Sequence, residues 1–167
     1  VRARLGNVGI IAEDLGFLTD DVHALLANTG YPGMKVLQFA FNPYEDNMYL
    51  PHNYPRNCVA YTGTHDNDTS LGWWRACSDQ TRRNLREALG EVDDSTVVWR
   101  MIKAVFDSRA NIAMAPMQDF LGLDSAARMN TPGTVGEKNW RYRALSSDFS
   151  AELAARMRAL CEESGRV

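Results

Sequence analysis

The chain has 167 residues, 45% of them apolar and 10% aromatic, and its 18 Lys and Arg against 21 Asp and Glu give a formal net charge of −3. This slightly acidic mixture excludes a dedicated nucleic-acid module, which usually carries a basic stripe. No apolar run reaches the roughly 18 residues that span a bilayer, and residues 1–9 lack the apolar stretch of a secretory signal. We therefore predict a soluble, cytoplasmic protein of one domain or part of one.

The cysteines and the first residues carry two further signals. Cys58, Cys77 and Cys161 are odd in number and widely spaced, so they indicate neither a disulfide framework nor a Cys-x-x-Cys metal clip. The chain begins with Val1, and an apolar run starts at Val8. Both features suggest an excerpt from a longer chain.

The first part of the chain predicts a strand, a helix and a second strand. Residues 8–12 form a continuous apolar run that ends in Glu13-Asp14, as in a strand buried on both faces. Thr19 is a candidate N-cap for a helix of about 10 residues that ends at Gly30. Residues 34–41 predict the second strand. This order is typical of a parallel sheet.

The remainder of the chain continues the same alternation. Residues 42–57 contain three of the six prolines and predict a long loop. Residues 58–62 predict a third strand, which leads directly into the polar stretch 63–69. Helical spacing follows over about 71–89 and about 96–108. The last predicted elements are a fourth strand over 112–117 with its exit at Pro116, a loop over 129–140 and a closing helix over 149–163.

Four parallel strands with polar residues at their carboxyl ends predict an α/β fold. One architecture that fits is half of a (β/α)8 TIM barrel, because a whole barrel usually needs about 250 residues. The competing architecture is a small doubly wound sheet. That fold expects a Gly-rich phosphate turn after its first strand, and none follows residues 8–12.

Glu13 and Asp66 are the strongest catalytic candidates, because each follows a buried apolar strand. The carboxyl ends of parallel strands lie on one rim, where two carboxylates can flank a glycosidic bond. One would protonate the leaving oxygen while others stabilise positive charge on the ring. The alternative is structural, since Glu13 or Asp14 could cap the following helix.

Two other groups of residues contain side chains that could bind a metal or a sugar. The stretch His65-Asp66-Asn67-Asp68 contains metal-ligand residue types, but only alternate residues of an extended segment share a side, so metal binding is not favoured. Aromatic side chains in or beside loops could stack on sugar rings, although adjacent tryptophans on a helix predict that one packs inward. These aromatic candidates are Tyr44, Tyr49, Tyr54, Trp73, Trp74 and Trp140.

Five motifs in one order resemble the 4-alpha-glucanotransferases, the amylomaltases or disproportionating enzymes of glycoside hydrolase family 77. They begin with Ile11-Ala12-Glu13-Asp14-Leu15-Gly16 and cover about four fifths of the chain. The other four are Pro32-Gly33-Met34-Lys35-Val36-Leu37-Gln38-Phe39-Ala40-Phe41, Leu50-Pro51-His52-Asn53-Tyr54-Pro55, Tyr61-Thr62-Gly63-Thr64-His65-Asp66-Asn67-Asp68-Thr69, and Ala127-Arg128-Met129-Asn130 with Pro132-Gly133.

The resemblance implies a (β/α)8 barrel that transfers segments of α-1,4-glucan by a retaining double displacement. Glu13 matches the general acid/base of the family and Asp66 its transition-state-stabilising carboxylate. His65 is implied to hydrogen-bond the sugar at the cleavage point, and Asn130 and Phe39 to line the glucan groove. The implied partners are an α-1,4-glucan donor and a glucose or maltooligosaccharide acceptor, with no cofactor, metal, nucleic acid or membrane.

One departure from the family concerns the nucleophile. The family's nucleophilic aspartate lies on the strand before the one that ends in Glu13, and its motif is not found in this sequence. Residues 1–167 are therefore expected to be the C-terminal portion of one catalytic barrel, about four strands, with the upstream half absent. We expect this chain alone to be inactive and to self-associate through the exposed edges of residues 8–12 and 112–117.

Two alternatives to a glycosyltransferase-type enzyme stay open on the sequence. An α-glucan hydrolase would use the same carboxylates with water as the acceptor. A non-catalytic glucan-binding module would retain binding when Glu13 is replaced by glutamine.

Overall fold

The computed structural model describes residues 4, 6, 8–16, 18–41 and 48–166. Its centre is a parallel sheet in the order β1 (Gly33–Val36), β2 (Cys58–Tyr61) and β3 (Ile112–Met114). In its register, Gly33 lies opposite Cys58 and Val59 lies opposite Ile112. The predicted α/β class with parallel strands is confirmed, but the described residues form three strands instead of four.

The strand predicted over residues 8–12 is the one that does not form. A single backbone hydrogen bond, from Ala12 N to Pro32 O at 2.9 Å, connects this run to the chain before β1. Val8 and Ile11 are 47% and 42% exposed. An apolar run becomes a buried strand only when a ladder pairs its backbone and neighbouring layers cover its side chains, and the described residues supply neither here.

The second predicted strand is shorter than residues 34–41. Pairing with β2 ends at Val36, and Leu37–Phe41 forms the 3₁₀ helix η1. This turn buries Leu37 and Phe41 in the core, which explains why an apolar run here did not mean a longer strand. Residues 42–47, part of the predicted loop, lie outside the described residues, and Pro51–Asn53 forms the 3₁₀ helix η2.

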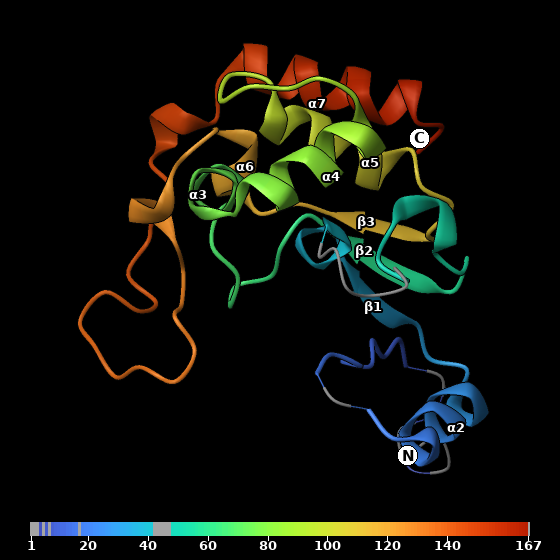
Figure 1. Ribbon diagram of the computed structural model, residues 1–167. Helices are drawn as coiled ribbons and strands as arrows, with labels where there is room; N and C mark the ends of the chain where they lie inside the picture. Colours follow the sequence, from blue (N-terminus) through green and yellow to red (C-terminus); the bar gives the residue numbers. More distant parts are fainter. Residues whose placement is uncertain (1–3, 5, 7, 17, 42–47, 167) are drawn as a thin grey trace.

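Helices after β2 gather over one face of the sheet (Figure 1). α5 (Val97–Phe106) provides the centre of the core, because six of its ten side chains are buried. The other elements on this side are α3 (Ser70–Ala76), α4 (Asp79–Leu89), α6 (Met117–Phe120), α7 (Ala151–Glu163) and the 3₁₀ helices η3 (Ser125–Ala127) and η4 (Ser146–Asp148). The predicted helices over 96–108 and 149–163 are confirmed with slightly shorter bounds.

The single helix predicted over 71–89 is two helices, α3 and α4. The break falls at Cys77 and Ser78, where Ser78 Oγ accepts a hydrogen bond from Thr81 N at 3.1 Å and caps α4. Serine competes well for such a cap, because its hydroxyl satisfies an amide that has no partner inside the helix. The apolar spacing alone did not reveal this interruption.

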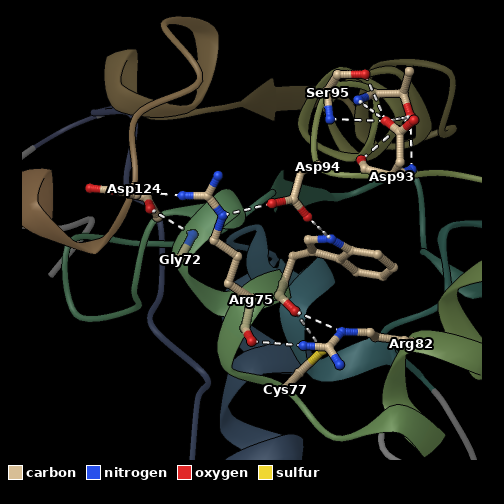
Figure 2. Close-up of polar contacts among 11 residues, drawn as sticks. Gly72, Arg75, Cys77, Arg82, Asp93, Asp94, Ser95 and Asp124 are labelled. Atoms are coloured by element: carbon tan, nitrogen blue, oxygen red, sulfur yellow. Dashed lines mark hydrogen bonds and ion pairs between the residues drawn. The ribbon is translucent and has the colours of Figure 1, made fainter.

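A polar network joins these helices on the molecular surface (Figure 2). Arg75 of α3 pairs with Asp94 at 2.8 Å and with Asp124 at 3.6 Å. Trp74 Nε1 donates to the same Asp94 at 2.9 Å, and Arg82 of α4 donates to Arg75 O at 2.7 Å. One arginine thus ties α3 to the segments that precede α5 and η3.

α2 (Asp20–Thr29) confirms the predicted first helix, although it lies apart from the other helices, beyond β1 (Figure 1). Gly30 ends it in the left-handed conformation, with φ 66°. None of its side chains is buried, so its apolar residues are not part of the core described above. No helix in the described part of the chain is long and apolar enough to cross a membrane.

Candidate active site

Four of the predicted site residues line one cavity of about 660 Å³ at the carboxyl ends of the strands. These four are Glu13, Phe39, His65 and Asp66. The residues that end β2 and β3, Tyr61 and Met114, also line it, as do Leu15, Gly16, Met34, Gly63, Thr64, Asn67, Ala115, Pro116 and Pro132. Two carboxylates that are 53 positions apart in the sequence therefore border the same space.

Asp14 fixes the backbone that carries Glu13. Glu13 is exposed, whereas Asp14 is buried and accepts a hydrogen bond from Met34 N at 2.5 Å. Lys35 Nζ lies 3.6 Å from the other carboxylate oxygen of Asp14, and both side chains are less than 10% exposed. A buried carboxylate needs such partners. The role of Asp14 is thus to attach the Glu13 segment to β1, a function that sequence reasoning missed.

The carboxylate of Asp14 requires glycine at position 33. A Cβ built on Gly33 would lie 2.5 Å from Asp14 Oδ2. We expect Gly33→Ala to displace Asp14 and with it Glu13, and to lower the free energy of unfolding by about 1–3 kcal/mol through overpacking. Chemical denaturation measures the change. Gly136→Ala is the matched control, because a Cβ there meets nothing within 4 Å; equal effects of the two substitutions would contradict this account.

A tight turn after β2 presents Asp66 to the cavity. Asn67 Oδ1 accepts hydrogen bonds from Thr64 N at 2.9 Å and Thr64 Oγ1 at 2.8 Å, and Asn67 N donates to Thr64 O. Asp68 faces elsewhere and accepts from Ser125 Oγ at 2.7 Å. Of the side chains that suggested a metal site in the sequence, Asn67 thus builds the turn and Asp68 is bonded to Ser125, while His65 and Asp66 remain half-exposed beside the cavity.

The Asp66 carboxylate is held by two neighbours. Asn130 Nδ2 donates to Asp66 Oδ1 at 2.6 Å, and His65 Nε2 lies 3.3 Å from the same oxygen. Both contacts leave Oδ2 facing no hydrogen-bond donor of the described residues. Asn130 contacts Asp66 instead of lining the cavity. The structure thus brings all five predicted site residues to one region, either on the cavity wall or in contact with it.

The aromatic candidates separate into core and site. Tyr54 is fully buried and Trp74 nearly so, which makes both of them core residues. Tyr49 packs edge-on against Phe39, with 5.4 Å between ring centroids. Trp140 is 55% exposed, has the positive φ of 62°, and lies 5.2 Å from the His65 ring. Tyr44 lies outside the described residues, and Trp73 packs against Phe41.

Asp119 of α6 is a second buried carboxylate, behind the turn that carries Asp66. It accepts hydrogen bonds from Thr62 Oγ1 at 2.6 Å, from Ser70 N at 2.8 Å and from Ser70 Oγ at 2.7 Å. Burial raises the pKa of Asp119 more than these hydrogen bonds lower it, and the negative charge of Asp68 raises it further. Asp119 thus joins both ends of the segment 62–70. Its one sequence signal is a carboxylate close to the apolar residues Met117 and Phe120 of α6.

Comparisons with known proteins show the family to which the chain is related. A family model described as 4-alpha-glucanotransferase, glycoside hydrolase family 77, matches residues 1–147. The chain is 51% identical over 151 residues to a 4-alpha-glucanotransferase of Streptococcus pneumoniae serotype 4, covering 90% of this chain and 30% of that protein. It is 43% identical to one from Clostridium butyricum, covering 99% of this chain and 34% of the relative.

A solved structure of an amylomaltase is also similar to this chain. An amylomaltase from Streptococcus agalactiae, in complex with acarbose, is 30% identical and superposes with a TM-score of 0.92 over 99% of this chain and 33% of that one. The chain spans about a third of the length of the curated relatives it matches. A relative from Arabidopsis thaliana, 46% identical over 98% of this chain and 29% of its own length, is named chloroplastic/amyloplastic, so the cytoplasmic location stays a prediction from the sequence.

Proposed function

This chain belongs to the 4-alpha-glucanotransferase family, and from that membership we propose that it supplies two catalytic carboxylates of a retaining α-1,4-glucan transferase. The donor is an α-1,4-glucan, and the acceptor is glucose or a maltooligosaccharide. Glu13 is the general acid/base, and Asp66 stabilises the transition state. The observation that carries this proposal is that Glu13 and Asp66 line one cavity at the carboxyl ends of parallel strands.

The chemistry follows from what each carboxyl group can do beside a glycosidic bond. Protonated Glu13 donates its proton to the leaving glycosidic oxygen, and then, as carboxylate, removes a proton from the acceptor's 4-hydroxyl. Ionised Asp66 stabilises the positive charge that develops on the sugar ring in both steps. His65, on the same wall, hydrogen-bonds the sugar at the cleavage point, while Phe39 lines the glucan groove and Asn130 contributes to it by holding the carboxylate of Asp66.

The nucleophile of this double displacement lies, in this proposal, in the part of the relatives that the chain does not span. Residues 1–167 are then the C-terminal portion of one barrel. Two features support this: β3 exposes Ile112 and Met114, which are 37% and 40% accessible, and residues 8–12 have no ladder partner among the described residues. Unpaired apolar edges associate with another strand, so these edges would contact the rest of the barrel or a second copy of the chain.

Maltotriose tests the function directly. We expect this chain alone to leave maltotriose unchanged, and the same chain extended to the full length of its relatives to convert it into a ladder of longer and shorter maltooligosaccharides, separated by chromatography. Glucose and maltose alone would identify a hydrolase. Binding of maltotriose by the extended protein without any product would indicate a glucan-binding module, and a ladder from this chain alone would contradict the absence of the nucleophile.

A further inference from the structure

The guanidinium of Arg128 joins two main-chain carbonyl groups at the site. Its Nη2 donates to Asp66 O at 2.7 Å, and its Nε donates to Asn130 O at 2.8 Å. The planar guanidinium group fixes the direction of its donors. One side chain therefore sets the distance between the backbone of Asp66 and that of a residue 64 positions later in the chain.

The contacts of Asn130 show what this backbone connection controls. Asn130 N donates to His65 O at 3.1 Å, and its side chain donates to Asp66 Oδ1 at 2.6 Å. With the bond from Arg128 Nη2 to Asp66 O, three hydrogen bonds hold 65–66 against 128–130, and the bond from Arg128 Nε to Asn130 O braces the second segment internally. A shift of Asn130 relative to Asp66 would rotate the carboxylate, because the amide is bonded directly to it.

The segment that carries Arg128 is itself held firmly. Ala127 is buried, and its carbonyl oxygen accepts a hydrogen bond from Gln118 Nε2 at 3.1 Å. Ser125, in the preceding 3₁₀ helix, donates to Asp68 at 2.7 Å. Arg128 lies outside the wall of the larger cavity and lines a small one of about 130 Å³ behind the turn. It touches the backbone of Asp66 and not its carboxylate.

We propose that Arg128 is a positioning residue for Asp66, which it holds at the orientation needed to stabilise charge on the sugar ring. This assignment rests on the proposed function. A misplaced stabilising group weakens the transition state more than the ground state, because a glucan substrate is also held by many other contacts. Loss of Arg128 should therefore lower kcat while leaving KM nearly unchanged.

The test uses the chain extended to the full length of its relatives, with maltotriose as substrate. We expect Arg128→Ala to lower kcat about 10²-fold, the usual cost of a small misplacement, with KM within about twofold. Arg128→Lys, which keeps the charge but reaches only one carbonyl, should lose about tenfold. Millimolar guanidinium should partly restore Arg128→Ala and have no effect on Asp66→Asn. Arg83→Ala is the control, because exposed Arg83 forms its one side-chain hydrogen bond among the described residues with Gln80 of its own helix.

The thermal unfolding temperature of each variant shows whether a loss of kcat comes from a misplaced Asp66 or from a loss of structure. If Arg128→Ala does not fold, the kcat of Arg128→Lys tests the proposal. Unchanged kcat in Arg128→Lys, or an effect confined to KM, would overturn the role of Arg128 while the transferase activity stands. A complete protein that makes no ladder, or that keeps its activity in Asp66→Asn, overturns the proposed function and with it this assignment.

Discussion

Replacing Glu13 by glutamine is expected to lower transfer from maltotriose about 10³-fold in the protein extended to the full length of its relatives, the range that a lost general acid/base typically costs. Glutamine cannot protonate the leaving oxygen. It can still occupy the same exposed position, so folding should be unaffected. Chromatography of the products over time measures the effect.

An α-maltosyl fluoride donor distinguishes Glu13 from Asp66. Fluoride leaves without a proton, so Glu13→Gln should release a rapid first equivalent of fluoride and then stall, since the second step still needs a base. Asp66→Asn should slow the reaction of both donors, maltotriose and α-maltosyl fluoride, because the sugar ring develops positive charge whichever leaving group departs. Glu91→Gln is the control, because Glu91 only pairs on the surface with Arg86. Equal losses with the two donors for Glu13→Gln would contradict its assignment as the acid.

Asp119→Ala is expected to have the largest effect on stability, about 3 kcal/mol less free energy of unfolding. The substitution leaves the hydroxyl of Thr62 and two donors of Ser70 without their acceptor, and both residues are fully buried. Buried donors without partners cost about 1–3 kcal/mol each, partly relieved by rearrangement. Asp119→Asn should cost less, because an amide oxygen can still accept from Ser70 N and the hydroxyls can turn to accept from its amide.

Urea denaturation monitored by tryptophan fluorescence measures both Asp119 variants. Asp79→Ala is the matched control, since it removes only an exposed pair with Arg82. A loss of stability in Asp119→Ala no larger than in this control would show that the buried hydrogen bonds contribute little.

The pH dependence of the same measurement follows from the raised pKa of Asp119. A carboxyl group whose pKa is higher in the folded state binds a proton more tightly there, so folding is favoured when the group is protonated. Its contribution is complete below the unfolded pKa and is lost as the pH rises through the folded one. The stability of the wild-type protein relative to Asp119→Asn should therefore fall as the pH is raised from about 4. A constant difference would contradict the shift.

The elements that could be predicted from sequence are those whose signal is local. α2 begins and ends where its capping residues predict, α7 begins two residues after the predicted start and ends at the predicted residue, and β2 is a short apolar run that leads directly into the polar turn of Asp66. The strand predicted over residues 8–12 was wrong, because an apolar sequence indicates a tendency to be buried but not whether a neighbouring strand is present to pair with it. The helix break at Ser78 was not predicted because the spacing of apolar residues continues across it. The break depends on one hydrogen bond from Thr81 N to the Ser78 hydroxyl, which that spacing does not record.

The residues of the candidate site also divide into those that could be predicted from the sequence and those that could not. Glu13, His65 and Asp66 stand in motifs, and His65 and Asp66 follow β2, so their neighbourhood could be expected; their roles remain predictions for the experiments above. Asp14, Asp119 and Arg128 could not be found this way. Each acts through contacts with residues that are 20 to 62 positions away, and no local pattern records such a contact.

The hydrogen bonds between residues 65–66 and 128–130 also mean that one part of the site must be present before the other can be oriented. During synthesis the turn bearing Asp66 is complete while the residues that orient its side chain are still untranslated, and contacts between residues so far apart must first overcome the entropy of closing the loop between them. Until the second segment docks, the carboxylate lacks its fixed direction. This wall of the site can therefore be completed only after residues 128–130 have been synthesised, when α3 to α6 of the helical layer are already in the chain.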